Sequence, residues 1–322
     1  MTLRFTDRWI WDFWLVSEGD VHHVFYLQAP KSLGDPELRH RNVSIGHATS
    51  SDLTTWTPVA DALGPGAVGA FDDSSTWTGS IIRHDGEWAM LYTGTSNAEQ
   101  GLVQRIGLAT SPDLSVWSRH DRAVLTADPA IYETLDIDMW FDEAWRDPWM
   151  FVDPDDGHVH VFLTARANAG ARFDRGVVGH ARSKDLHAWE VLAPLDLFVS
   201  GFGQLEVPQL FELDGSWYLL FCSDVTTQSP ERRASGPGTG TYYLVGTSRY
   251  GPFEMIGDGA LAVDPIGSSY AGRVHRTSDG IVWFLDWDRC ADDGSFIGEL
   301  GAPRRVHARA DRSLVLVSDV RP

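Results

Sequence analysis

The chain has 322 residues, of which 43% are hydrophobic and 14 are tryptophans, and its formal net charge is −19. This length fits one large all-β domain or two ordinary domains, and the hydrophobic content is enough for a sizeable core. A surface this acidic repels phosphate backbones and anionic lipid, so we expect no nucleic-acid or membrane partner, whereas a neutral substrate is compatible with it.

Cysteine use and the N-terminus bear on where the protein works. Cys222 and Cys290 each lie in an apolar run, which favours two inert thiols over a disulfide or a metal site. Residues 1–7 contain no apolar signal region, and no segment is long enough to cross a bilayer. We therefore expect a cytoplasmic protein, although a secreted chain trimmed of its signal peptide has the same appearance.

One motif recurs along the chain. Its complete copies share Gly, Ala, Ser, Asp-Leu and Trp at the same spacing, and a last copy is degenerate: Ile45–Trp56, Ile106–Trp117, Val178–Trp189 and Val245–Phe253. The copies lie about 60 to 70 residues apart, which is enough chain for one small antiparallel sheet each. Sheets of this kind arranged around an axis form a β-propeller.

Runs rich in β-branched and aromatic residues indicate the strands. The second strand of each blade is predicted at Val21–Gln28, Glu87–Gly94, His158–Ala165, Ser216–Ser223 and Gly280–Trp287. Asp-Gly dipeptides, which favour hairpin turns, precede four of these runs. Inner strands are therefore expected before the turns, at Trp9–Val16, Trp77–Arg83, Arg146–Val152, Glu206–Glu212 and Tyr270–Thr277. Fourth strands should follow the Asp-Leu turns, as at Thr55–Ala60, Trp189–Leu192 and Ser313–Val317.

These elements predict an all-β, five-bladed β-propeller with four antiparallel strands per blade, in a single domain over residues 1–322. The first and fifth blades should close the ring by packing, and we expect no C-terminal β-sandwich. The segment Ser229–Gly240 is interpreted as a hairpin loop and not as a domain linker. A pair of β-sandwiches is the alternative, which the regular five-fold recurrence disfavours.

Three carboxylates mark the predicted central funnel. Inner strands line a propeller axis, and aligning the blades on their turns gives about equivalent positions to Asp12, Thr78, Asp147, Glu206 and Ala271. A single such acid is more often a turn cap, but three at one position are more than coincidence. Converging carboxylates can bind a cation or perform acid/base chemistry. Neighbouring tryptophans favour a sugar ligand, and they raise the pKa of a nearby acid as a general acid requires.

At these positions the chain resembles a known group of enzymes. The boxes Trp11-Asp12-Phe13-Trp14, Arg146-Asp147-Pro148 and Glu206-Val207-Pro208 are similar to the signature boxes of the β-fructosidase superfamily. That superfamily comprises glycoside hydrolase families 32 and 68, with invertases, inulinases, levanases and levansucrases. The first copy of the repeat motif, His23–Gln28 and Trp77–Ser80 also resemble family sequence.

The resemblance implies a retaining glycosidase that acts on β-fructofuranosides, with carbohydrate as its partner. Asp12 would be the nucleophile, Glu206 the general acid and then the base, and Asp147 the residue that stabilises the transition state. Arg146 would be oriented beside Asp147, and further sugar contacts would come from Trp77, Ser80, Gln28 and Trp11. For Trp77 and Gln28, an ordinary core or turn role is an equally good interpretation.

The chain departs from family 32 in three respects. The usual Asn-Asp-Pro-Asn-Gly box is replaced by Trp11–Trp14, which is closer to family 68, and Val207 stands where Cys is usual. No segment follows the fifth blade for the C-terminal β-sandwich of family 32. These departures leave open which fructoside is the substrate and whether water or a sugar is the acceptor.

Two other functions compete with this interpretation. An arabinofuranosidase or arabinanase uses a related propeller with three acids, but the Arg-Asp-Pro and Trp-Asp boxes disfavour it. A non-catalytic sugar-binding propeller would need neither a nucleophile nor an acid. The oligomeric state is left open.

We expect no cofactor and no metal, because neither a glycine-rich phosphate loop nor an oxygen-rich calcium loop is recognisable. His158 and His160 share a strand face, but no third ligand is evident. The rim of the funnel should carry the loops between second and third strands: Ala29–Asn42, Thr95–Gln104, Arg166–Gly176 and Asp224–Thr241.

Overall fold

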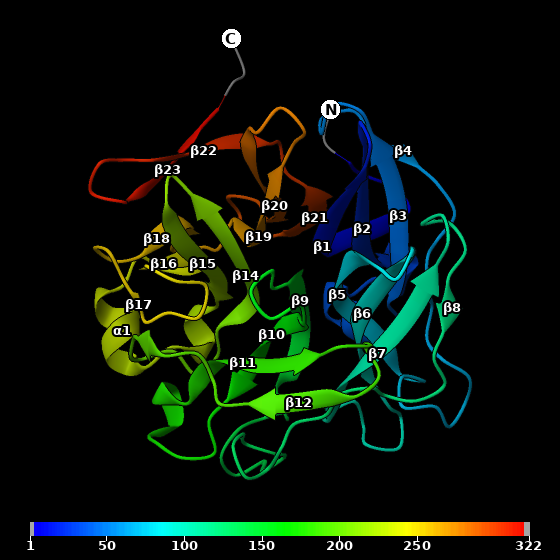
Figure 1. The fold of residues 1–322 in the computed structure, drawn as a ribbon, viewed down its shortest axis with the longest axis horizontal. Coiled ribbons are helices and arrows are strands. Elements are labelled where there is room, and N and C mark those ends of the chain that lie inside the picture. The colour runs from blue at the N-terminus through cyan, green and yellow to red at the C-terminus, as the bar shows by residue number, and fades with distance from the viewer. Residues whose placement is uncertain (1–2, 319–322) are drawn as a thin grey trace.

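Five antiparallel sheets follow one another along the chain and lie around a common axis (Figure 1). This arrangement comes from a computed structural model that describes residues 3–318. It confirms the predicted all-β, five-bladed propeller. The predicted domain also includes residues 1–2 and 319–322, which lie outside the described residues. No β-sandwich follows the fifth blade within residues 3–318, and none of the helices described there is long and apolar enough to span a membrane.

The blades occupy consecutive stretches of sequence. Blade one consists of β1 (Arg8–Glu18), β2 (Val21–Pro30), β3 (Ser44–Ser50) and β4 (Thr57–Pro58). Blade two consists of β5 (Ser75–His84), β6 (Glu87–Thr95), β7 (Gln104–Ser111) and β8 (Ser118–Arg119). Blade three consists of β9 (Trp145–Val152), β10 (Val159–Arg166), β11 (Gly176–Ser183) and β12 (Trp189–Leu192).

The last two blades carry extra strands beyond the predicted four. Blade four consists of β14 (Glu206–Leu213), β15 (Ser216–Ser223), β16 (Thr239–Gly246) and β17 (Phe253–Glu254), with added strands β13 (Leu197–Phe198) and β18 (Ala260–Asp264). Blade five consists of β19 (Ser269–Arg276), β20 (Val282–Cys290), β22 (Arg304–Ala308) and β23 (Leu314–Val317), with β21 (Phe296–Leu300) added beside β20. Among the strands described in residues 3–318, β13 and β17 form the one parallel pair.

Short helices occur only in the connections between described strands. They are η1 (Lys31–Leu33), η2 (Pro36–Arg41), η3 (Arg172–Asp174), η4 (Val225–Thr227) and α1 (Pro230–Ser235). Helix α1 falls inside Ser229–Gly240, which joins β15 to β16 as the predicted hairpin loop.

The recurring motif begins in the third strand of blades one to four, at β3, β7, β11 and β16. Gly46 and Gly107 lie against aromatic rings, and an added Cβ would come within 2.3 Å of Tyr26 and 2.4 Å of Tyr92. The Asp-Leu pair then closes a tight turn, in which the Asp52 carboxylate accepts backbone N–H bonds from two residues that follow it, at 2.7 and 2.8 Å. The glycine of the motif therefore makes room for an aromatic side chain of the second strand, and its Asp-Leu pair forms the turn that follows the third strand.

Every inner strand has a register break at the same place. The break occurs at Asp12, Thr78, Asp147, Val207 and Ala271. All of these except Thr78 have positive φ, from 30° to 56°. A bulge re-aims side chains, here towards the propeller axis. The predicted alignment of the blades placed Glu206 level with Asp12 and Asp147, and this is wrong by one residue. Val207 is the bulge residue of blade four, and Glu206 corresponds to the residues just before the other bulges: Trp11, Trp77, Arg146 and Tyr270.

The ring closes by packing, as predicted. Blade five (orange to red) lies beside blade one (blue), and β1 packs against β19 and β21 (Figure 1). The Arg273 guanidinium donates to the Phe13 carbonyl at 3.3 Å, and the Leu300 N–H donates to the Leu3 carbonyl at 3.0 Å.

Two blades contain the same buried histidine pair. The His23 and His47 rings share a hydrogen bond of 2.9 Å, and the His160 and His180 rings share one of 2.8 Å. Burial lowers the pKa of His47 and of His180 to about 3, so both rings are neutral at neutral pH.

These pairs should make the fold sensitive to acid. In the unfolded chain a histidine takes up a proton near pH 6.5, which native His47 does not. The buried neutral His47 ring therefore contributes fully to the free energy of unfolding above pH 6.5, and this contribution is lost as the pH falls towards 3. We expect His47→Gln to be less stable than the wild type at pH 7.5, with the difference shrinking by about 2 kcal/mol at pH 5. Urea unfolding at both pH values measures this, and a difference that does not change with pH would contradict it.

Candidate active site

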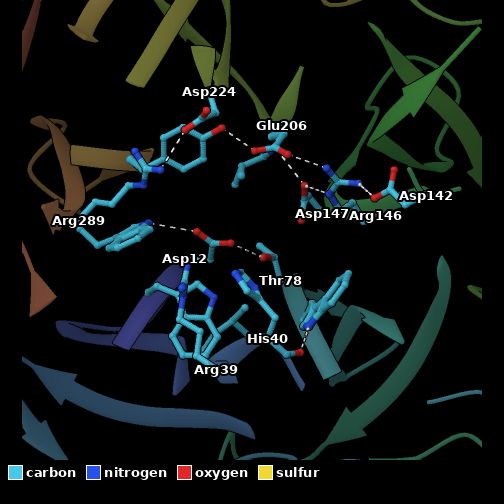
Figure 2. A pocket seen from close by; sticks show the side chains of 16 residues that line it. Asp12, Arg39, His40, Thr78, Asp142, Arg146, Asp147, Glu206, Asp224 and Arg289 are labelled. Atoms are coloured by element: carbon cyan, nitrogen blue, oxygen red, sulfur yellow. Dashed lines mark hydrogen bonds and ion pairs between the residues drawn. The ribbon is translucent and has the colours of Figure 1, made fainter. Parts of the chain in front are cut away.

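The starts of the inner strands surround one pocket of about 260 Å³ (Figure 2). Each blade contributes the residue before its bulge, and four blades also contribute the bulge residue: Trp11, Asp12, Trp77, Thr78, Arg146, Asp147, Glu206, Val207 and Tyr270. Six of the eight sequence-predicted site residues therefore meet in this pocket: the three acids, Arg146, Trp11 and Trp77.

Ser80 and Gln28 do not line this pocket, and the predicted sugar contacts of these two residues are corrected. Ser80 lies beyond the bulge of β5, is buried, and accepts the Met150 N–H at 3.0 Å across to the next blade. Side chains alternate along a strand. Leu27 therefore reaches the pocket, while Gln28 bonds to Arg8 and Ser44 elsewhere.

Glu206 is held by two donors. Its Oε1 accepts from Arg146 Nη2 at 2.6 Å, and its Oε2 accepts from the Tyr270 hydroxyl at 2.5 Å. Burial raises the pKa of Glu206, although Arg146 and Tyr270 act in the opposite direction. The raised pKa favours the protonated form of this carboxyl group.

One carboxylate oxygen of Asp147 is held by hydrogen bonds from the protein. Its Oδ2 accepts from the Thr164 hydroxyl at 2.8 Å and from the Val207 N–H at 3.2 Å. Arg146 Nε lies 3.5 Å from the same oxygen. Within residues 3–318 the other oxygen, Oδ1, has no hydrogen-bond donor, so it is available to a ligand.

Asp12 lies across the pocket from Glu206 and Arg146 (Figure 2). Its Oδ1 accepts from the Trp287 indole at 3.1 Å and its Oδ2 from the Thr78 hydroxyl at 3.3 Å. Burial raises the pKa of Asp12 to about 7, and the charges of Asp147 and Glu206 add to this. Protonation of Glu206 would therefore make Asp12 easier to ionise.

Sequence reasoning missed much of the pocket wall. The missed residues come from loops and from second strands: Leu27, Arg39, His40, Asp142, Asp224, Trp287 and Arg289. Tyr270 was also missed, although it directly precedes Ala271, which the blade alignment had selected. Trp287 pairs with Tyr270 across the blade, and only the strand register shows that it faces the axis.

The rim differs in part from the predicted one. Arg39 and His40 come from the loop after β2, and Asp224 comes directly after β15, as expected. Asp142 instead belongs to the connection between β8 of blade two and β9 of blade three, which was not among the predicted rim loops. None of the residues of Ser229–Gly240 lines this pocket.

The two cysteines are free thiols, as expected. Cys222 is buried beside the site, where it pairs with Glu206 across β14 and β15.

Among residues 3–318, one group of three side chains has the spacing of metal ligands: Asp153, Asp156 and His160. The sequence analysis found no third ligand for the histidines of this strand. In the structure, Asp153 accepts from Arg249 at 2.6 Å and from the Tyr250 hydroxyl, and Asp156 contacts His160 at 3.1 Å. Internal partners therefore already engage these groups.

The fold and the paired buried carboxyl groups define a glycosidase-like propeller. The chain belongs to the glycosyl hydrolases family 32 N-terminal domain family, whose profile matches residues 14–317. This match confirms the resemblance to the β-fructosidase superfamily at the level of the family.

Relatives of this chain are named for different activities. Levansucrase LscA of Pseudomonas savastanoi pv. glycinea is 27% identical over 77% of this chain and 67% of its own length. An extracellular sucrase of Zymomonas mobilis subsp. mobilis is 24% identical over 96% of this chain and 81% of the relative. Sucrose-6-phosphate hydrolase of Escherichia coli is 27% identical over 64% of this chain and 39% of the relative. The chain spans about half the length of other Pseudomonas levansucrases. A cytoplasmic location stays a prediction.

Solved structures show the same fold. The inulosucrase of Halalkalicoccus jeotgali, bound to kestose, superposes with a TM-score of 0.79 at 22% identity, covering 98% of this chain and 89% of that chain.

The Trp287 hydrogen bond should favour the ionised form of Asp12. Trp287→Phe removes this donor but keeps an aromatic ring against Phe296. Because a hydrogen bond to a charged group contributes about 1.5–3 kcal/mol, the acidic limb of the kcat/KM profile should move to higher pH by about one unit. The matched control is Trp88→Phe, since the buried Trp88 indole N–H has no acceptor among the described residues. An unshifted limb in Trp287→Phe would contradict this role.

Chelation should leave the protein unchanged. Because the Asp153, Asp156 and His160 group is satisfied internally, dialysis against EDTA should change neither the melting temperature nor the activity. A loss that added calcium or zinc restores would show that this group or a pocket carboxylate binds metal.

Proposed function

We propose that this protein is a retaining glycosidase that cleaves or transfers β-fructofuranosyl units of sucrose, fructo-oligosaccharides or fructans through a covalent fructosyl-enzyme. The observation that carries the proposal is the pairing of two unlike acids in one buried pocket. Asp12 is held by Trp287 and Thr78, and on the opposite wall Glu206 is held by Arg146 and Tyr270.

In the first step Asp12 attacks the anomeric carbon while Glu206 gives its proton to the leaving oxygen. The bond from the anomeric carbon to that oxygen breaks, and an ester to Asp12 forms. In the second step Glu206 takes a proton from the acceptor, whose oxygen displaces Asp12 and restores the starting configuration. Water as acceptor gives hydrolysis, and a sugar hydroxyl gives transfer.

In the free protein burial raises the pKa of Asp12 to about 7, so the cycle requires Asp12 to give up a proton before it can react. The reactive form has one proton on the pair, carried by Glu206, with Asp12 ionised. Since the Glu206 charge is one cause of the raised Asp12 pKa, protonating Glu206 favours this form. Burial shifts the pKa of Glu206 upward, which is the direction that a general acid requires.

Asp147 is placed to bind the sugar and not to react with it. Its Oδ2 is used by the protein, and its Oδ1 can accept a ring hydroxyl. Hydrogen bonds to the hydroxyls of the ring strengthen in the transition state of glycoside cleavage, so Asp147 is the proposed stabilising residue.

The two acids should respond differently to isosteric substitution. Asp12→Asn removes the nucleophile, so turnover should fall by several orders of magnitude, or about 5 kcal/mol or more of barrier. Glu206→Gln should also slow sucrose cleavage, but much less for a fructoside with an activated leaving group, because that group needs no proton. Initial rates on both substrates measure this, and equal losses for the two variants on the activated substrate would contradict the assigned roles.

Product analysis tests substrate and stereochemistry together. Sucrose, raffinose, inulin, levan and an aryl arabinoside are offered in parallel, and proton NMR follows the first product. We expect fructose released or transferred in the β configuration. An inverted first product would exclude Asp12 as nucleophile, and cleavage of the arabinoside alone would favour an arabinofuranosidase.

A further inference from the structure

Negative charge exceeds positive charge in the pocket. The charged groups that line it are five carboxyl groups and three guanidinium groups: Asp12, Asp142, Asp147, Glu206 and Asp224, with Arg39, Arg146 and Arg289. Even when Glu206 is protonated, four carboxylates remain. His40 adds no charge at neutral pH, because burial and the nearby Arg39 lower its pKa to about 4.

Two of the guanidinium groups are committed to carboxylates. Arg146 donates to Asp142 at 3.1 Å and to Glu206 at 2.6 Å. Arg289 donates from Nη2 to Asp224 Oδ2 at 3.0 Å. An incoming anion would have to displace one of these carboxylates or lie beside it.

The third guanidinium is held apart from the other two. Arg39 lies over the Phe296 ring at 4.4 Å and near Trp11 at 5.6 Å, and it donates to Glu37 at 2.9 Å. Its buried Nε has no acceptor among the described residues. A phosphate dianion needs several donors and a net positive surrounding, which a single guanidinium held apart from the other two does not supply.

Asp142 and Asp224 line the pocket from loops, outside the strands that carry Asp12 and Asp147. In the proposed function, on which this inference rests, the fructosyl ring lies between Asp12 and Asp147. Its leaving group then meets these two carboxylates.

We infer that this site selects electrically neutral, unphosphorylated fructosides and rejects their sugar phosphates. A sucrose-6-phosphate hydrolase is among the relatives, so the choice is a real one for this family. The Asp224–Arg289 ion pair determines this selectivity. A phosphate on the leaving group would need an unpaired guanidinium at this place, but the Arg289 guanidinium is already neutralised by Asp224.

The test compares sucrose with sucrose 6-phosphate at equal ionic strength. We expect kcat/KM to favour sucrose by about a hundredfold or more, with most of the difference in KM. Asp224→Asn frees Arg289 and should narrow this preference about tenfold. Glu254→Gln is the matched control, because it also removes one negative charge from an ion pair with an arginine, here Arg312. This pair is exposed and does not line the pocket, so the preference for sucrose should not change.

Calorimetry on the Asp12→Asn variant separates this inference from the catalytic proposal. Sucrose should bind at least tenfold more tightly than sucrose 6-phosphate. If neither sugar is turned over by the wild type but this binding preference holds, the catalytic proposal fails and the selectivity stands. Equal or tighter binding of sucrose 6-phosphate, or no binding of sucrose, would overturn the inference.

Discussion

One buried guanidinium, that of Arg146, forms ion pairs with three carboxylates of the pocket. Arg146 is 8% exposed and lies among Asp142, Asp147 and Glu206. Burial alone would lower the pKa of Arg146, but the surrounding carboxylates raise it above its usual value, so it stays charged. Without this cation the carboxylates would be buried and unpaired, and removing one partner of such a network costs about 3–5 kcal/mol.

The propeller supplies the geometry that this network needs. Each inner strand presents two adjacent positions to the axis, one before the bulge and one at it. Four of the bulge residues have positive φ without being glycine, a conformation that costs about 1–2 kcal/mol each. Through these bulges, side chains from all five blades line one pocket.

Much of the fold could be predicted from local sequence, because its signals are local. Asp85-Gly86 and Asp214-Gly215 turn with positive φ at both residues, as the dipeptide indicates, and the inner strands begin within a few residues of the predicted starts. The six predicted site residues that line the pocket were found because they occupy the beginnings of those strands.

The rest depended on information that local sequence does not contain. The bulge shifts the register, which moved Glu206 by one position and turned Ser80 away from the axis. Alternation along β2 put Leu27 in the pocket in place of Gln28. Trp287, Arg39 and Asp142 reach the site through strand pairing and loop conformation, and no motif marks them.

The central claim is that Asp12 becomes covalently bonded to a fructosyl group. Glu206→Gln lacks the base of the second step, so an activated fructoside should load this variant faster than water unloads it. Rapid acid quench, proteolysis and mass spectrometry of the peptides locate the sugar. The account predicts one fructosyl unit on the peptide that contains Asp12. A sugar on the peptide that contains Asp147, or no adduct while turnover proceeds, would contradict it.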